Sequence, residues 1–174
     1  PAGVNHLVLN VADIERSHHF WTELMGFELV STVQLGSEMR FYRAGPGHHH
    51  DVAIMQVKEP PAEPAPAKWR PSARKLGINH IAICYPTREE FLTRLRVLKE
   101  QGVEFRQRGN HGMTHSVYVS DPDGNGIEVL YELPEEVWVN DVHGALNYWQ
   151  DMPLDGDEAL TDPTDYPVFS SAAK

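Results

Sequence analysis

Two short stretches of the chain decide its fold: Val4-Asn5-His6-Leu7-Val8-Leu9 and Ile78-Asn79-His80-Ile81-Ala82-Ile83. Each is an apolar run that carries the same Asn-His pair, and each precedes a segment with helical spacing. A repeated strand of this kind indicates two similar modules in one chain. The repeated histidines, His6 and His80, are candidates for two ligands of one metal site.

The residues that follow these strands give both halves the same β-α-β-β-β order. Asp13 is a predicted N-cap for the first helix, and Thr87 with Glu90 forms a capping box at the start of the second. The predicted elements are strands at 4–11, 27–35, 39–42 and 51–57 with a helix at 13–26, then strands at 77–85, 103–105, 116–119 and 127–130 with a helix at 87–102. The predicted fold class is therefore α+β, with two tandem βαβββ modules.

The first 133 residues are predicted to form a single domain. Module one spans residues 3–58 and module two spans residues 76–133. Between them, residues 59–75 contain five prolines and are predicted to be an extended linker, since proline cannot join the interior of a sheet.

An acidic C-terminal extension follows at residues 134–174. From Glu132 to Asp165 the chain has ten Asp or Glu residues and no Lys or Arg. We expect a short helix at 145–149, an otherwise loosely ordered or wrapping segment, and solvated acidic side chains. The tryptophans Trp138 and Trp149 are expected to be core or interface residues.

Composition narrows the possible partners. A formal net charge of −10 argues against nucleic acid, because phosphates would repel the chain. No apolar run approaches the roughly 18 residues of a membrane span, and the N-terminus lacks a signal-peptide pattern. Cys84 is the single cysteine, so no intrachain disulfide is possible. We therefore expect a cytoplasmic protein without a membrane or nucleic-acid partner.

The strongest candidate site consists of His6, His80 and Glu128, each on a predicted strand. A single strand histidine is more often an ordinary hydrogen-bonded residue than a ligand. An ionised carboxylate inside a sheet, however, is costly unless it is paired, and a cation shared with two neutral imidazoles would pair it. The repeat and the carboxylate together favour a metal site.

With the turn and strand Asp121-Pro122-Asp123-Gly124-Asn125-Gly126-Ile127-Glu128, the repeated pattern resembles the vicinal oxygen chelate superfamily over about residues 3–133. That superfamily includes glyoxalase I, fosfomycin-resistance proteins, methylmalonyl-CoA epimerase and type I extradiol ring-cleaving dioxygenases. The resemblance implies a shared, incompletely closed barrel-like sheet around a metal held by His6, His80 and Glu128. Membership of the superfamily leaves the reaction open.

The segment His48-His49-His50-Asp51-Val52-Ala53-Ile54 helps to select the reaction. It is similar to the extradiol dioxygenase segment that supplies the acid–base histidine, and His50 is the matching position. Glyoxalase I has a metal-binding glutamate in this strand, whereas here no carboxylate follows Asp51 until Glu59. The resemblance therefore implies three protein ligands. For His48 and His49 the alternative is a place in a solvated loop.

A second segment that helps to select the reaction is His111-Gly112-Met113-Thr114-His115-Ser116-Val117-Tyr118. In the dioxygenases a tyrosine lies ten residues before the ligand glutamate, as Tyr118 does before Glu128. The resemblance implies that His111 is the histidine that assists Tyr118. His115 is the alternative, although strand alternation places it on the face opposite Tyr118.

Together these residues predict an Fe(II)-dependent extradiol dioxygenase, with Mn(II) as the substitute metal, that cleaves a catechol-type aromatic ring with O2. The catalytic residues would be His50, Tyr118 and His111. Two alternatives remain: an O2-independent lyase, isomerase or epoxide-opening enzyme, and a ligand-binding protein without chemistry. Open sheet edges favour a homo-oligomer, a dimer or a higher assembly.

Overall fold

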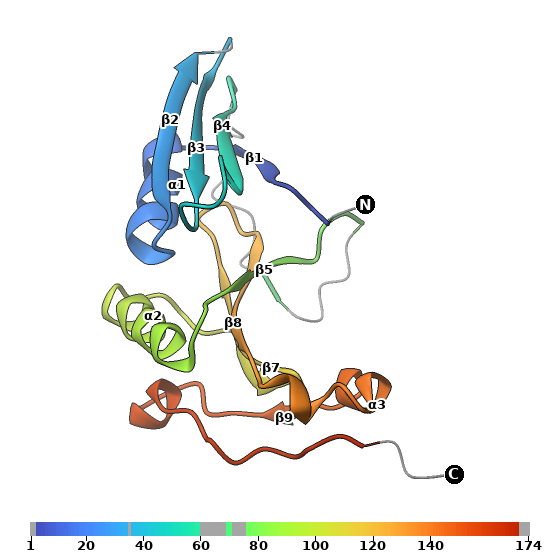
Figure 1. The fold of residues 1–174 in the computed structure, drawn as a ribbon. Helices are drawn as coiled ribbons and strands as arrows, with labels where there is room; N and C mark the ends of the chain where they lie inside the picture. The colour runs from blue at the N-terminus through green and yellow to red at the C-terminus, as the bar shows by residue number, and fades with distance from the viewer. Residues whose placement is uncertain (1–2, 35, 60–68, 71–75, 171–174) are drawn as a thin grey trace. The chain divides into compact units, whose positions relative to one another are not determined.

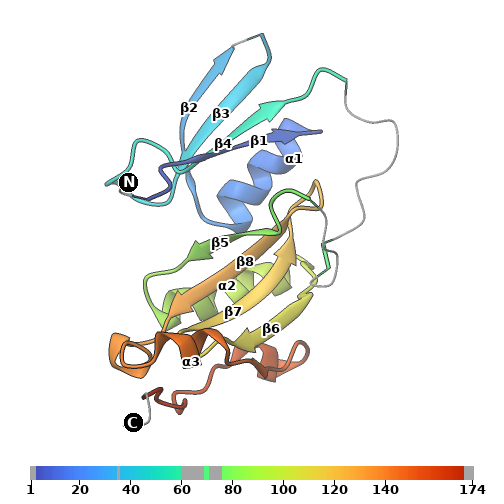
Figure 2. The same cartoon turned by 90° about the vertical axis from the view of Figure 1, so that its right-hand side faces the viewer.

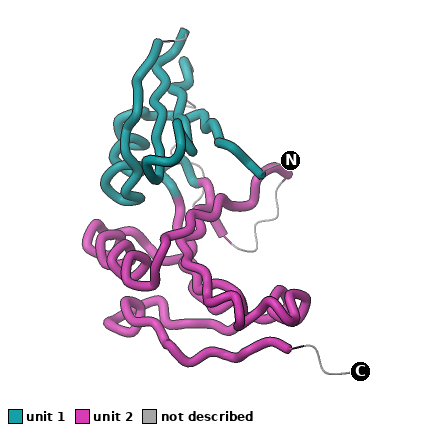
Figure 3. The backbone as a smooth tube through the Cα atoms, viewed as in Figure 1, with its two compact units in different colours: residues 1–67, 121–124 teal, residues 68–120, 125–174 magenta. Residues whose placement is uncertain are grey.

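The computed structural model describes residues 3–34, 36–59, 69–70 and 76–170. The chain divides into two compact units, which are coloured separately in Figure 3. Unit 1 comprises residues 1–67 and 121–124, and unit 2 comprises residues 68–120 and 125–174. The predicted Pro-rich linker lies outside the described residues, apart from Glu59, Trp69 and Arg70. No helix in the described parts of the chain is long and apolar enough to cross a membrane.

Unit 1 is a four-stranded mixed sheet with one helix (Figure 1). Its elements are β1 (Leu7–Val11), α1 (Ile14–His19), which continues into the π-helical turn η1 (Phe20–Leu24), β2 (Glu28–Gln34), β3 (Glu38–Arg43) and β4 (Val52–Gln56). The strand order is β1-β4-β3-β2, and β1 runs parallel to β4. Asp13 is the N-cap of α1, as predicted, because its side chain accepts hydrogen bonds from the backbone N–H groups of Glu15 and Arg16.

The first strand of unit 2, β5, is the second copy of the repeated strand (Figure 2). Its elements are β5 (His80–Cys84), α2 (Arg88–Glu100), β6 (Gln107–Asn110), β7 (Thr114–Ser120), β8 (Gly126–Glu132), η2 (Glu135–Val137), α3 (Val142–Leu146), β9 (Gln150–Asp151) and η3 (Asp157–Leu160). The strands form a five-stranded sheet in the order β5-β8-β7-β6-β9. On α2 the buried stripe Phe91, Leu92, Leu95 and Leu98 has helical spacing. Phe91 contacts Tyr131 of β8, so α2 covers the sheet face that carries Tyr131.

The α+β fold with two βαβββ-like modules is confirmed, and its strands form two mixed sheets that are not closed. The predicted strand at 103–105 is wrong, because β6 begins only at Gln107. Gly102 adopts a φ of 73°, which ends α2, and the N–H of Val103 still bonds to Leu98 of that helix. The chain therefore needs residues 103–106 to pass from the helix to the sheet.

The C-terminal extension wraps onto unit 2 and is more ordered than its composition predicts. β9 pairs with β6, so the extension adds a strand to the sheet. The predicted helix at 145–149 lies slightly earlier, as α3, and ends before Trp149. Asp162 is only 5% exposed and pairs with the buried Arg108 at 2.9 Å, so the expectation of a wholly solvated acidic tail is wrong here.

Candidate functional site

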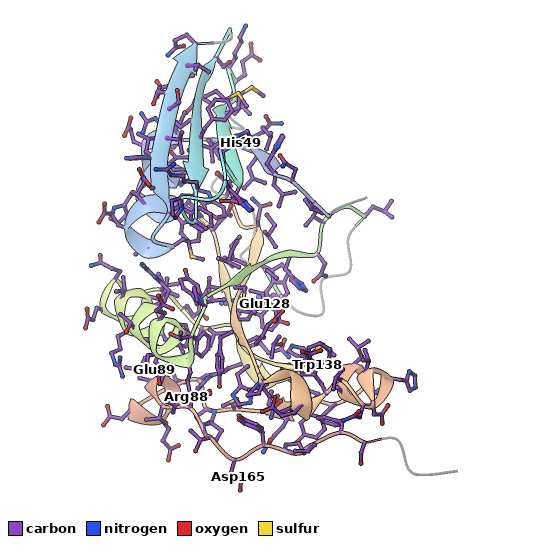
Figure 4. All side chains as sticks on the ribbon, viewed as in Figure 1. His49, Arg88, Glu89, Glu128, Trp138 and Asp165 are labelled. Carbon is purple, nitrogen blue, oxygen red and sulfur yellow. The ribbon has the colours of Figure 1, made fainter. Side chains whose placement is uncertain are left out.

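A histidine and a carboxylate meet on the face of the unit 2 sheet opposite α2. His80 is the first residue of β5, and Glu128 pairs with Ala82 in the parallel β5–β8 ladder. Because side chains alternate along a strand, His80 and Glu128 share one face. Figure 4 labels Glu128, which is only 7% exposed. The Nε2 atom of His80 lies 3.0 Å from one of its carboxylate oxygens.

Tyr118 holds the other oxygen of the same carboxylate. It pairs directly with Glu128 across the antiparallel β7–β8 ladder, and its hydroxyl donates a hydrogen bond of 2.8 Å to Glu128. The Nε2 atom of His111 lies 2.8 Å from the same hydroxyl. Since the single hydroxyl proton points to Glu128, the Nε2–H of His111 is the donor to Tyr118. The three residues form a continuous hydrogen-bonded chain.

The pKa values of Tyr118 and His111 suit neutral hydrogen-bond donors. Burial, together with the adjacent Glu128 carboxylate, raises the pKa of Tyr118 well above its usual value, so the phenol keeps its proton. Burial lowers the pKa of His111, an effect that Glu128 opposes and His80 reinforces. At neutral pH the imidazole of His111 is therefore uncharged and offers one N–H.

His115, the alternative partner of Tyr118, points to the other face of β7. It is fully buried, its Nδ1 lies 2.7 Å from Asp162, and its ring meets Tyr131 edge-on. Of the two candidate histidines, the structure brings only His111 to Tyr118, while His115 helps to fasten the C-terminal extension.

In unit 1 the structure brings His6 and His50 together. His6 lies just before β1 and is exposed, and its ring centroid is 4.4 Å from that of His50. Burial and the neighbouring His6 and His49 lower the pKa of His50, so its imidazole is neutral at pH 7 and can accept a proton. His48 instead pairs with Asp51 in the loop.

The two repeated histidines make the same hydrogen bond to the asparagine that precedes each of them. The Nδ1 of His6 lies 2.7 Å from the side-chain oxygen of Asn5, and the Nδ1 of His80 lies 2.8 Å from that of Asn79. An Nδ1–H that donates to this oxygen leaves Nε2 unprotonated, as is usual for metal-binding histidines. The Asn-His pair therefore fixes the tautomer that a metal requires.

The pairing of His80 with Glu128 also fits a metal. An unprotonated Nε2 and a carboxylate oxygen 3.0 Å apart are two acceptors, so a proton or a cation must lie between them. Two ligands about 2.1 Å from one ion and roughly at right angles are about 3.0 Å apart. Within the described residues no group of three or more His, Cys, Asp or Glu side chains is gathered as a ligand set, and His6 belongs to unit 1.

Module one offers no counterpart of Glu128. The repeat matches Val8 with Ala82; Val8 pairs with Ala53 of β4, whereas Ala82 pairs with Glu128 of β8. Ala53 thus occupies the position of the carboxylate, and the protein ligands predicted from the sequence remain three.

Two residues of this region were not assigned to the site from sequence. Trp69, in the Pro-rich segment, stacks on Tyr118 with a centroid distance of 5.2 Å and an angle of 12°. Trp149, expected to be a core or interface residue, lies 4.6 Å from His111. An isolated tryptophan among prolines was the only sequence signal for Trp69, because no periodicity connects it to β7.

The comparisons with known proteins agree with this architecture. The family model of the Glyoxalase/Bleomycin resistance protein/Dioxygenase superfamily matches residues 3–129, and the chain belongs to this superfamily. A solved domain of that description from Frankia sp. EAN1pec superposes with a TM-score of 0.62 at 16% identity, covering 76% of this chain and 99% of that one. This likeness shows the fold. Members of the superfamily use divalent metals such as iron or manganese.

Curated relatives include two kinds of enzyme. The chain is 28% identical over 141 residues to the catechol-2,3-dioxygenase of Bacillus subtilis (strain 168), which covers 81% of this chain and 45% of the relative. It is 27% identical over 158 residues to the lactoylglutathione lyase of Pseudomonas putida, which covers 75% of this chain and 85% of the relative. The chain thus spans less than half the length of the Bacillus protein.

Proposed function

We propose that the protein is an Fe(II)-dependent extradiol dioxygenase that cleaves a catechol-type ring with O2, with Mn(II) as the substitute metal. His6, His80 and Glu128 would hold the ion. The observation that carries the proposal is the pairing of His80 with Glu128, whose carboxylate is held in turn by Tyr118 and His111. When bound, the ion supplies Lewis acidity toward two vicinal oxygens and a route for electrons to O2.

His50 would act as the acid–base group. Its neutral imidazole can take a proton from a catechol hydroxyl as the substrate binds and return a proton when the ring opens. Its place beside His6, one of the proposed ligands, supports this role. Tyr118 and His111 would orient the substrate oxygens through the Tyr118 hydroxyl and the His111 imidazole, whose hydrogens bond to Glu128 and to Tyr118 before a substrate binds. The product would be a ring-opened semialdehyde or its acyl analogue.

Two observations favour this reaction over the others of the superfamily. Ala53 stands where a fourth ligand would be expected in a glyoxalase-like site, and three protein ligands leave room for two substrate oxygens and O2. The Bacillus relative is also named for catechol cleavage, although this chain spans only 45% of it.

The test is oxygen consumption by protein reconstituted with Fe(II) under anaerobic conditions and then mixed with a panel of catechols in aerated buffer. We expect oxygen uptake and a yellow product with at least one catechol. The absence of both, with every catechol and with iron retention verified, would rule out the proposal.

A second candidate is an O2-independent lyase or isomerase, which the similarity to the Pseudomonas lactoylglutathione lyase favours. Turnover of a hemithioacetal in the absence of O2, with Mn(II), Ni(II) or Zn(II), would support it. A protein that only binds a ligand needs no metal, so a preparation that never retains a divalent ion would favour that third class instead.

The homo-oligomer predicted from the sequence remains a proposal. β2 is an edge strand of the unit 1 sheet, and it exposes Leu29 and Val30 by 39% and 42%. Exposed apolar residues on a sheet edge favour pairing with another copy. Light scattering after size exclusion would measure the assembly, and a monomer at micromolar concentration would contradict it.

A further inference from the structure

Two tryptophans from outside the repeated strands flank the hydrogen-bonded chain of Glu128, Tyr118 and His111. Trp69 comes from the segment between the modules, and Trp149 comes from the C-terminal extension. Trp69 covers Tyr118, whereas Trp149 abuts His111. Both therefore act on the two residues that carry the proposed hydrogen bonds to substrate.

Trp69 is fixed on the sheet by its backbone and by a glycine. Trp69 is 8% exposed. Its backbone N–H donates to the Ser120 hydroxyl at 3.0 Å, and its backbone carbonyl accepts a hydrogen bond from the Arg106 side chain. A Cβ at position 126 would lie 2.5 Å from the indole nitrogen, so Gly126 provides the space for the ring. In the described parts of the chain the indole N–H has no hydrogen-bond partner, so the backbone hydrogen bonds and the packing over Gly126 hold the ring against Tyr118.

Trp149 is fixed in a similar way beside His111, at the other end of the hydrogen-bonded series. Its indole N–H donates to Asp151 at 2.9 Å, and Asp151 pairs with Gly109 in the β6–β9 ladder. A Cβ on Gly109 would collide with the indole ring, so a glycine again provides the space. The ring then meets His111 edge-on at 4.6 Å and 67°.

We propose that Trp69 and Trp149 are positioning residues that hold the Tyr118 ring and the His111 ring in the orientation in which their mutual hydrogen bond persists. A phenol and an imidazole rotate about their side-chain bonds unless a neighbour restricts them. Trp69 stacks on the Tyr118 ring and Trp149 packs edge-on against the His111 ring, so each tryptophan restricts one of them. Trp69 is also edge-on to His80 at 6.2 Å, so it limits the space beside the proposed ligand. The kinetic part of the test rests on the proposed dioxygenase function; the spectroscopic part does not.

The experiment compares W69A, W69F, W149A and W149F with W138A in the full chain. Trp138 is the matched control, because it lies in the extension (Figure 4), donates to the Leu133 carbonyl and, among the described residues, makes no ring contact with Tyr118 or His111. The first readout is the ¹⁵N spectrum of the histidines in metal-free protein at one fixed pH, which reports the tautomer of His111. The second is kcat and KM for a catechol after loading with Fe(II). W69L and W149L replace any alanine variant that does not fold.

In the wild type and in W138A we expect His111 as a single Nε2–H tautomer. In W69A and W149A we expect its signals to move toward an average of both tautomers, and kcat to fall about 10- to 100-fold with KM changed less than about threefold. The phenylalanine variants should recover kcat to within about fivefold, since a flat ring still covers Tyr118 or His111.

An unchanged His111 spectrum in both alanine variants would overturn the proposal, as would a lower melting temperature alone, with kcat equal to that of W138A. If the wild-type protein consumes no O2 with any catechol, the proposed function fails, and the His111 spectrum by itself decides the positioning role.

Discussion

The Tyr118 hydroxyl donates a hydrogen bond of 2.8 Å to the Glu128 carboxylate across the β7–β8 ladder, and both side chains are buried. The register that pairs the two residues makes this contact a direct consequence of how β7 and β8 align. A slip of one residue would place Tyr118 on the opposite face of the sheet. The contact therefore joins the fold to the proposed chemistry.

Tyr118→Phe removes this hydrogen bond and leaves a buried carboxylate with one fewer donor. We expect the free energy of unfolding of the metal-free protein to fall by ~1–3 kcal/mol in urea titrations, and turnover of the loaded protein to be lost. Tyr148→Phe makes the same chemical change at a hydroxyl that bonds to Gln150 in an exposed setting, and should stay within ~0.5 kcal/mol. Equal effects of the two changes would show that the bond to Glu128 has no special weight.

The proposed division of labour among the histidines predicts different losses. His6→Ala and His80→Ala should abolish iron retention, measured by elemental analysis after anaerobic loading and gel filtration, because each removes one of three protein ligands. His50→Ala should retain iron yet lose turnover. His143→Ala, at an exposed position of α3, is the control for both measurements. Normal turnover of His50→Ala would contradict its assigned role.

Gly126→Ala should displace Trp69. The new Cβ would lie 2.5 Å from the indole nitrogen, and neither the strand backbone nor the stacked ring can move freely. We expect a loss of ~1–3 kcal/mol in unfolding free energy and a changed tryptophan emission spectrum. Gly47→Ala is the control, since a Cβ there meets nothing within 4 Å. If the emission spectrum of Gly126→Ala matched that of the wild type, the packing of the Trp69 ring over Gly126 would be contradicted.

Asp162 predicts an acid-sensitive attachment of the C-terminal extension. Burial by itself raises the pKa of this carboxyl, but hydrogen bonds from His115 and Tyr131 and the charge of Arg108 outweigh burial, and the net pKa is lowered. A lowered pKa stabilises the folded state above the unfolded-state value of about 3.9, and this stability is lost as pH falls through the folded-state pKa below it. Urea unfolding between pH 7 and pH 3 should show this loss in the wild type.

Asp162→Asn should remove that pH dependence and destabilise the protein at pH 7 by ~3–5 kcal/mol, because Arg108 remains buried without its charged partner. Asp165→Asn, three residues further along the extension and exposed (Figure 4), should change stability by less than ~0.5 kcal/mol and keep the acid sensitivity. A similar pH profile for both variants would mean that other carboxyl groups cause the acid sensitivity.

Local patterns predicted much of the scaffold. Asp13 and Thr87 start α1 and α2 as their capping positions indicate, because a cap bonds only to backbone groups two or three residues away. Strand alternation likewise separated Tyr118 from His115 before any tertiary contact was known. The strand predicted at 103–105 failed, because an apolar run can also be a buried connection, as Phe105 is.

By itself the sequence determined the two βαβββ modules, the repeated Asn-His pairs and the separation of Tyr118 from His115, since these depend on residues near one another in the chain or on the two-residue period of strands. Only the tertiary structure decided that His111 bonds to Tyr118, that Asp162 is buried against Arg108, and that two tryptophans rest on strand glycines. Those contacts join segments with no common period, and a glycine in a strand does not indicate which distant ring fills the space above it.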